Sequence, residues 1–236
     1  MMRTNRLLSR LSVAAVFTIY GCSASFSPPM RSIHETAPGL TSAHEGTVAV
    51  AGALPNRVGA TVSIPVAHGL RVEAHGDGSD LWVVGNVGVR ATEHIGNSRV
   101  TVDQELGGGG GLGGARCGNT GESGSSCSTG TADGLAWSQR VAYGGYTGIG
   151  LGVRLAPWVH AFARARVQVS QATQAPLTFW ASGLAGPAFR YGRVSWYGGV
   201  GYGGYANRDD RAGTLLVETG MGVAFDVLPR ESNTPQ

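Results

Sequence analysis

Residues 158–170 alternate between apolar and polar side chains with a period of two. The odd positions carry only Val and Ala, whereas the even positions are polar apart from Trp158 and Phe162. Successive side chains of a β-strand point to opposite sides, so this alternation predicts a strand with one apolar face and one polar face. The pattern recurs along most of the chain, which predicts an all-β protein.

Nine further segments share the alternation and are separated by turn signals rich in Gly, Pro, Asn and Asp. The ten predicted strands are residues 47–54, 58–66, 70–76, 81–91, 99–106, 141–155, 158–170, 177–191, 194–205 and 215–227. Strands of this length and an even strand number are typical of outer-membrane barrels. Residues 46–227 are therefore predicted to form an antiparallel up-and-down transmembrane β-barrel, with ten strands favoured over eight.

Composition decides which face of the strands is expected to meet lipid. The chain has 236 residues with 39 Gly, and 14% of them are charged, whereas soluble domains have about 25%. A soluble sandwich would leave the Gly-rich faces in water and its sheet edges open. In a barrel with the apolar faces outward, Gly-rich faces line a narrow interior. Aromatic residues near strand ends are expected at the membrane interfaces: Tyr143, Trp158, Phe179, Tyr191, Trp196, Tyr202 and Phe225.

Polar positions on these strands then converge inside the barrel. Charges that far from bulk water need partners, so the sequence predicts an interior packed with ion pairs. The predicted interior polar cluster comprises Arg71, Glu73, His75, Arg90, Asp103, Arg154, His160, Arg164, Arg166, Arg190, Glu218 and Asp226.

Residues 1–21 have the features of a secretory signal peptide. Arg3, Arg6 and Arg10 precede an apolar run at 11–20 that is too short to span a membrane as a helix. The whole chain has 18 basic and 15 acidic residues, so removal of this leader leaves a balanced charge. The sequence therefore gives no electrostatic reason to expect nucleic acid as a partner.

The leader ends in Ile19-Tyr20-Gly21-Cys22, which resembles the lipobox of bacterial lipoproteins except at Tyr20, where a small or aliphatic residue is usual. This resemblance implies cleavage before Cys22 and lipidation of its thiol and new amino group. Ser23 implies sorting to the outer membrane. The alternative is an ordinary signal peptide with a chance Cys. Residues 22–45, rich in Pro, Ser and Thr, are predicted to be a flexible tether between the lipid anchor and the barrel.

Residues 46–227 resemble the small outer-membrane β-barrel proteins of Gram-negative bacteria, in phrases such as GLGVRLAPWVHAFARARV and in a last strand that ends near Phe225. This resemblance implies an outer-membrane location and outer-membrane lipid as the partner. The loop lengths place both chain ends on the periplasmic side, which predicts a lipid anchor on that side. Residues 228–236 are then a C-terminal tail.

Residues 114–134 are predicted to be a long extracellular loop. This loop contains Cys117 and Cys127. An even pair of Cys in an exported chain predicts a disulfide, because the thiols pass through an oxidising compartment. A metal site is not expected, since no His or Asp stands at ligand spacing from them.

Catalysis would have to use His75 or His160, with Ser170, Glu73 or Glu218 as a partner. The chain has neither a Gly-x-Ser-x-Gly elbow nor a His-Glu-x-x-His motif, so we expect no enzyme activity and no cofactor. The favoured function is a non-catalytic lipoprotein barrel with a structural or surface-recognition role and an unidentified surface partner. The alternatives are a narrow pore or small-ligand barrel, a soluble periplasmic β-sandwich lipoprotein, and an outer-membrane lipid-modifying enzyme.

Overall fold

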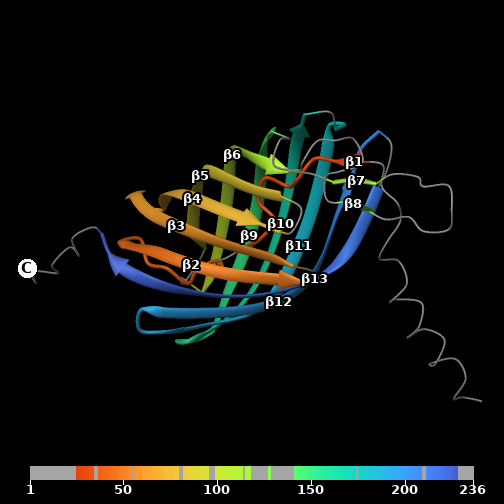
Figure 1. Ribbon diagram of the computed structural model, residues 1–236. Coiled ribbons are helices and arrows are strands. Elements are labelled where there is room, and N and C mark those ends of the chain that lie inside the picture. Colours follow the sequence, from red (N-terminus) through yellow and green to blue (C-terminus); the bar gives the residue numbers. More distant parts are fainter. Residues whose placement is uncertain are drawn as a thin grey trace, which may run out of the picture.

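The computed structural model describes residues 25–34, 37–54, 56–79, 82–95, 99–113, 115–117, 127–128, 141–173, 175–208 and 211–227. Within these residues, ten antiparallel strands close into one barrel (Figure 1). The strands are β2 (Glu45–Leu54), β3 (Arg57–Ala67), β4 (Leu70–Gly78), β5 (Trp82–Ile95), β6 (Val100–Gly113), β9 (Val141–Ala156), β10 (Val159–Ala172), β11 (Thr178–Tyr191), β12 (Val194–Ala206) and β13 (Arg211–Asp226). The predicted ten-stranded barrel is confirmed.

Neighbouring strands of the barrel pair in sequence order, and β13 pairs with β2 to close the ring. Closure removes the open sheet edges of a sandwich, so the soluble β-sandwich alternative is wrong. Three short strands, β1 (Ser25–Phe26), β7 (Ala115–Cys117) and β8 (Cys127–Ser128), form a second small sheet. The described part of the chain contains no helix that could span a membrane.

Strand β6 is longer than the sequence predicted, because the glycine run at 107–111 belongs to it. Pairing with β5 and β9 continues through all five glycines. A Cβ on Gly109 would lie 2.2 Å from the Gly85 carbonyl oxygen, and one on Gly111 would lie 2.0 Å from that of Val83. The run is therefore a strand segment in which neighbouring backbones approach too closely for side chains, and not the start of a loop.

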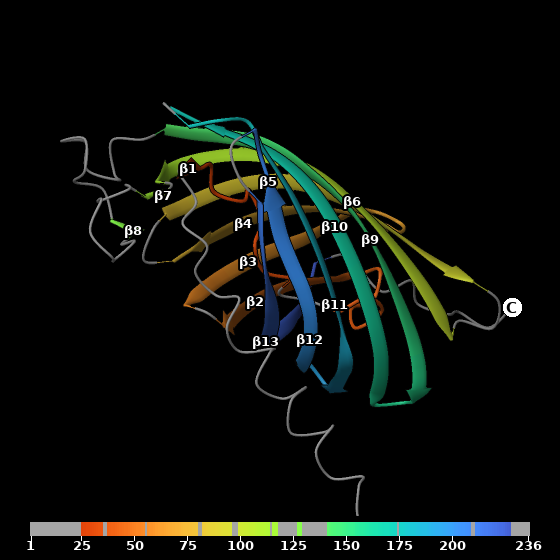
Figure 2. The ribbon, with the colours of Figure 1, turned by 90° about the vertical axis from the view of Figure 1, so that its right-hand side faces the viewer.

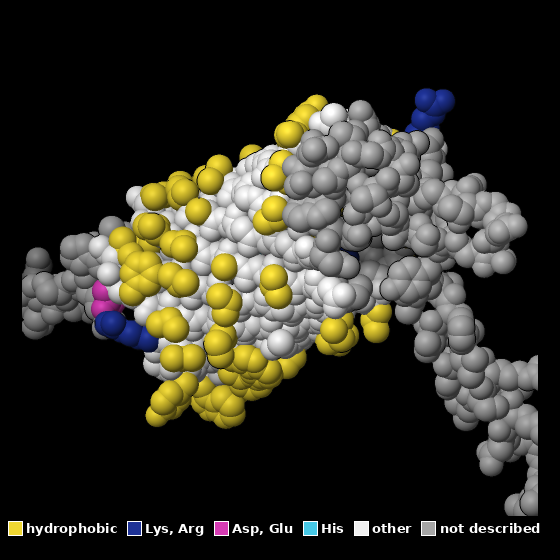
Figure 3. All heavy atoms as spheres, in the orientation of Figure 1, with side chains coloured by type: hydrophobic (Ala, Val, Ile, Leu, Met, Phe, Trp, Pro, Cys, Tyr) yellow, Lys and Arg dark blue, Asp and Glu magenta, His cyan; other side chains and the backbone are white. Residues whose placement is uncertain are grey.

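Apolar side chains of the strands point outward and form the outer wall of the barrel. Val87, Leu106 and Val200 are each more than 60% exposed although they lie well inside their strands. Figure 3 shows hydrophobic side chains spread across one side of the barrel, separated by the pale surface of backbone and small residues. A wall of this kind is suited to hydrocarbon and not to water, so the barrel is a transmembrane barrel.

The two ends of the barrel differ in the length of the connections between strands. Residues 68–69, 157–158 and 192–193 join strands at one end, the turn end, where β2 begins and β13 finishes. Residues 114–140 join β6 to β9 at the opposite end, the loop end, where β1, β7 and β8 lie (Figure 1). The chain segment before β2 connects these two ends (Figure 1).

Aromatic side chains mark the edges of the wall, as predicted. At the turn end, the Phe189 ring stacks between Trp158 and Trp196, with centroid distances of 6.2 and 5.3 Å. Tyr143, Phe179, Tyr191 and Tyr202 are exposed. The predicted interface residue Phe225 is half-buried, because its ring packs on the backbone of Gly46.

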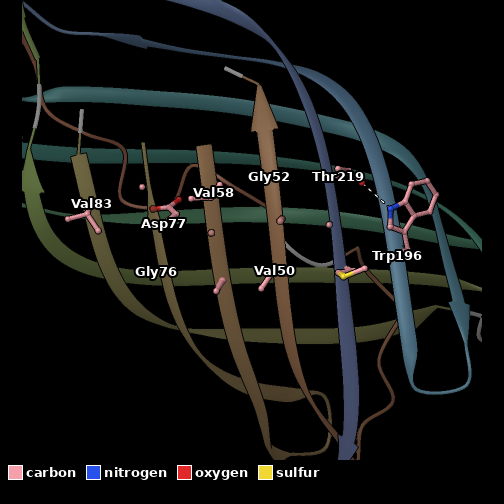
Figure 4. Close-up of a pocket in the computed structure, with 14 residues that line it drawn as sticks. Val50, Gly52, Val58, Gly76, Asp77, Val83, Trp196 and Thr219 are labelled. Carbon is pink, nitrogen blue, oxygen red and sulfur yellow. Dashed lines mark hydrogen bonds between the residues drawn. The ribbon is translucent and has the colours of Figure 1, made fainter. Parts of the chain in front are cut away.

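Small residues leave a groove in the outer wall over β2, β3, β4 and β13 (Figure 4). Its floor includes Gly52 and Gly76, and at one side the Trp196 indole N–H donates to Thr219 Oγ1 at 3.0 Å. Because the lining is almost entirely apolar and faces the lipid, acyl chains of the bilayer are its natural occupants.

A charge placed in the middle of the wall is expected to destabilise the barrel far more than one at its edge. Val87→Arg, near the centre of β5, should lower the free energy of unfolding by about 2–4 kcal/mol, whereas Val194→Arg, at the turn end of β12, should cost about 0–1 kcal/mol. Urea unfolding in lipid vesicles measures both. Equal losses for the two variants would show that the wall does not face hydrocarbon.

Candidate functional site

Residues 27–44, of which 35 and 36 are not described, pass through the interior of the barrel and are called the plug below (Figure 2). The side chains of Met30, Arg31, Ile33 and His34 are completely buried. For the described residues of the range 25–45, this corrects the flexible tether predicted for residues 22–45. A Pro- and Ser-rich composition is typical of a linker, but here the polar lumen supplies partners for the backbone groups of an extended chain.

Ser27 fixes the plug at the loop end. Its backbone N–H donates to Thr178 Oγ1 at 3.2 Å, and its hydroxyl donates to the Pro176 carbonyl at 3.1 Å. The hydroxyl also accepts the backbone N–H of Ala172 at 2.8 Å, and the Ser27 carbonyl accepts the Trp180 indole N–H at 3.0 Å. One serine therefore bonds to both strands of the β10–β11 pair and to the connection between them.

Amide side chains of the wall act as partners for the plug backbone. Gln168 accepts the Arg31 backbone N–H and donates to the Arg31 carbonyl, both at 2.8 Å. Asn86 donates its side-chain N–H to the Met30 carbonyl at 2.6 Å. These contacts replace the hydrogen bonds that a neighbouring strand would provide and satisfy the Met30 carbonyl and both backbone groups of Arg31.

At the centre of the lumen, Arg31 brings a cation between two acidic side chains of the wall. Its guanidinium lies 2.9 Å from Glu73 Oε2 and 3.5 Å from Glu105 Oε2. Glu73 is shared with Arg90 at 3.1 Å, and Glu105 is shared with Arg166 at 2.5 Å. All five side chains are at most 5% exposed, so the plug and the wall form one buried ionic network.

Two more wall residues extend this network toward the turn end. Arg164 pairs with Asp103 at 3.1 Å and donates to the His34 carbonyl at 3.2 Å. Arg166 donates to the Ile33 carbonyl at 2.9 Å. The arginines of β10 therefore bind both the acids of the wall and the backbone of the plug.

Acidic side chains also receive donors from the plug directly. Glu218 accepts the His34 backbone N–H at 2.8 Å, lies 3.1 Å from His34 Nδ1, and accepts the Tyr197 hydroxyl. Asp77 accepts both the backbone N–H and the hydroxyl of Ser32, at 2.5 and 2.8 Å. The plug is thus held from several sides of the barrel.

At the turn end, Arg190 and Arg71 hold the exit of the plug. Arg190 donates to the Leu40 carbonyl at 2.5 Å and pairs with Glu45 at 2.6 Å. Arg71 donates to the Glu45 carbonyl at 2.7 Å and to the Ser42 carbonyl at 3.3 Å. These contacts fix the point where the plug becomes strand β2.

Glycines on the inward face of β9 make room for the plug. A Cβ on Gly150 would lie 2.8 Å from Pro38 Cγ, and one on Gly152 would lie 2.6 Å from the Pro38 carbonyl oxygen. Gly39, next along the plug, has a φ of +79°, which favours glycine. The Gly-rich interior predicted from the sequence therefore has a specific function, which is to accommodate a second segment of the same chain.

The structure places most of the predicted interior cluster in the lumen. The buried members are Arg71, Glu73, His75, Arg90, Asp103, His160, Arg164, Arg166 and Glu218, and Arg190 is half-buried. Arg154 and Asp226 are corrections, since both are exposed at the turn end, where Asp226 pairs with Arg193. The alternation of inward and outward positions continues to the end of a strand. At the rim of the barrel, however, an inward position is open to water and is not buried.

Sequence reasoning missed Glu105 and the plug residues Arg31 and His34. Glu105 follows Asp103 by two positions and so has the inward parity, which would have identified it. Arg31 and His34 lie in a segment without alternation, and no sequence signal pointed to them.

The predicted cysteine sites are only partly described. Cys117 and Cys127 are register partners in the β7–β8 pair. No disulfide is found among the described residues, so this bond stays a prediction. Cys22, the signal peptide and the tail at 228–236 lie outside the described residues.

Candidate catalytic groups are already engaged in the lumen. His75 lies between Thr61 Oγ1, at 2.7 Å, and Asp77, at 3.3 Å, and all three are buried beside the plug. Ser170 bonds to the Ser27 carbonyl at 3.5 Å and lies within 3.3 Å of the Trp180 indole nitrogen. No group of three or more His, Cys, Asp or Glu side chains in the described ranges is arranged to hold a metal ion.

No protein-family model and no curated protein matches this chain. Among solved structures, a KdgM porin in complex with disordered oligogalacturonate is 7% identical, with 78% of this chain and 99% of that chain covered and a TM-score of 0.37. A de novo designed transmembrane β-barrel is 14% identical, covering 81% and 99%, with a TM-score of 0.28. A second KdgM porin structure is 9% identical, covering 77% and 99%, with a TM-score of 0.32. We transfer no residue role from proteins this distant.

Breaking the central ion pair should destabilise the barrel strongly and non-additively. Arg31→Met or Glu73→Gln alone should each cost about 3–5 kcal/mol, because each leaves buried charge uncompensated. The double variant should cost clearly less than the sum of the two. Urea unfolding in detergent micelles measures the free energies of unfolding of the wild type, the two single variants and the double variant, which together form a double-mutant cycle.

The exposed Arg193–Asp226 pair is the matched control for this cycle. Its side chains are 62% and 44% exposed, so Arg193→Met and Asp226→Asn should each cost less than about 1 kcal/mol. Strictly additive losses for Arg31 and Glu73 would show that the two do not interact through the network.

Proposed function

We propose that the protein is an outer-membrane barrel whose lumen is a narrow pore closed by the plug. The observation that carries this proposal is that described plug residues from Arg31 to Ser42 bond to charged side chains of the wall. A lumen filled by wall side chains alone would leave no path for a second segment. Here a chain segment runs from one end to the other, so its removal would leave a continuous passage lined by charged side chains and by two apolar clusters.

The chemistry of the lumen favours small hydrophilic solutes once the plug is displaced. Charges of opposite sign succeed one another around the wall, with Glu73 on β4, Arg90 on β5, Asp103 and Glu105 on β6 and, beyond β9, Arg164 and Arg166 on β10. Without the plug, these wall pairs would remain, and water would take the positions of the Arg31 guanidinium and of the plug backbone groups that the wall binds. The open state is therefore a hydrated pore lined by both signs of charge, suited to ions and small polar molecules.

The difference between the two ends of the barrel indicates how it is oriented in the outer membrane. Barrels of that membrane have short periplasmic turns and longer extracellular loops. We accordingly assign the turn end to the periplasm and the loop end to the outside. A secretory signal at residues 1–21 and lipidation of Cys22 are part of the same proposal, as is outer-membrane lipid as the surrounding partner.

A structural or surface-recognition role is the second candidate, and the β1–β7 pairing favours it. This pairing ties the two residues before the plug, Ser25 and Phe26, to residues 115–116 of the connection between β6 and β9. A permanently tied plug would make the barrel a rigid scaffold that displays its loops. In either case we propose no catalysis, since His75 and His160 are buried in the closed lumen.

Conductance in planar bilayers distinguishes the pore from the scaffold. The full chain should be closed, and deletion of residues 27–44 should give discrete conducting steps. A synthetic peptide with the sequence of residues 25–44, added to the deleted barrel, should block these steps. The same peptide with Arg31→Ala and His34→Ala should block much more weakly, because it lacks the ion pair with Glu73 and the imidazole contact with Glu218 and keeps only the backbone bond at position 34.

Folding of the deletion variant is checked by heat modifiability, the shift in gel mobility on boiling that a closed barrel shows. Should the deletion not fold, a protease site inserted between Ala43 and His44 allows the plug to be cut after folding. A folded, unplugged barrel that does not conduct would contradict the pore and support the scaffold.

Lipidation is tested separately with a labelled fatty acid. Cells that express the wild-type chain should incorporate the label into the protein, and Cys22→Ser should abolish incorporation. Cys117→Ser, which leaves the leader intact, is the matched control and should remain labelled. Equal labelling of wild type and Cys22→Ser would contradict a lipid at Cys22.

A further inference from the structure

The plug runs through the barrel from the loop end to the turn end. Directly before it, Ser25 and Phe26 pair in β1 with Arg116 and Ala115 of β7, next to the long loop. At its finish, the chain enters β2 at Glu45, on the turn end (Figure 1). The segment before Ser25 therefore departs from the loop end, opposite to the end where β13 stops.

Chain geometry then limits where Cys22 can lie. Two residues, Ser23 and Ala24, lie between it and Ser25, and the three Cα–Cα steps from Cys22 to Ser25 reach at most about 11 Å. The apolar band of an outer-membrane barrel is about 25 Å tall. A Cys22 tied to Ser25 in this position cannot reach the leaflet at the turn end.

We propose that the mature N-terminus is displayed on the outer surface of the cell, and that a lipid on Cys22 is anchored in the outer leaflet. This reverses the periplasmic-side anchor expected from the sequence, which assumed that residues 22–45 lead away from the start of β2 outside the barrel. The two ends of the chain then lie on opposite sides of the membrane. The inference rests on the outer-membrane orientation proposed above, but not on whether the pore opens.

The contacts at Ser27 help to fix the direction in which the plug runs through the barrel. Its hydrogen bonds to Thr178, Pro176, Ala172 and Trp180 are all at the loop end, where β10 meets β11. Arg190 and Arg71 bind the other end of the plug at Leu40 and Ser42. Reversing the direction of the segment would break both sets of contacts.

The test uses the full chain in intact cells, with one epitope tag at a time. The first tag stands between Ala24 and Ser25, the second follows Arg208 in the connection between β12 and β13 at the loop end, and the third follows Gln236. Each variant is first shown to be heat-modifiable. Antibody labelling is then compared before and after permeabilisation of the outer membrane.

Labelling of the first and second tags on intact cells, with the third tag labelled only after permeabilisation, is the expected result. A first tag that is hidden while the second is labelled would overturn the threading, and would leave the orientation of the barrel intact. A hidden second tag would overturn the orientation itself, and with it the outer-surface location of the N-terminus. The conductance of the unplugged barrel is independent of these outcomes.

Discussion

Charges inside a lipid-surrounded barrel must be neutralised within it, and the arrangement of the plug depends on this constraint. Moving an ion out of water costs several kcal/mol unless a partner and further hydrogen bonds are supplied. Arg31 supplies a cation to Glu73 and Glu105, which are also shared with Arg90 and Arg166. In the closed barrel, Arg31 and the wall residues together satisfy these charges, whereas in the open state proposed above water would take the place of the plug.

Backbone and side-chain size then decide whether a segment can enter at all. Inward glycines on β9 let Pro38 approach Gly150 and Gly152 at distances that a Cβ would prevent. The outward face of the same strand carries Ile149 and Leu151, both exposed to lipid. One strand thus provides a smooth floor for the plug and an apolar wall for the membrane, because its two faces are independent.

The barrel could be predicted from the sequence because alternation is a local signal that each strand carries in its own residues. The plug could not, because its fold depends on contacts between distant parts of the chain. Ser27 bonds to Thr178, 151 positions away, and His34 bonds to Glu218, 184 positions away. Nothing in residues 27–44 alone distinguishes a buried segment from a linker. The prediction was wrong for the rim residues Arg154 and Asp226 for a different reason. Alternation assigns a side chain to the inner or outer face of a strand, but it does not show where the strand leaves the membrane.

The path of the plug through the barrel limits the ways in which the proposed pore can open. The plug is continuous with β2 at the turn end, so a free N-terminus could let it withdraw through the lumen toward the periplasm. A lipid anchored in the outer leaflet would prevent this, because acyl chains do not pass through a lumen lined with charge. Both ends of the plug would then be fixed, and opening would require the segment to shift sideways within the barrel, against Gln168 and Asn86. A lipidated N-terminus therefore favours a small or rarely open pore, whereas an unlipidated one permits complete expulsion of the plug.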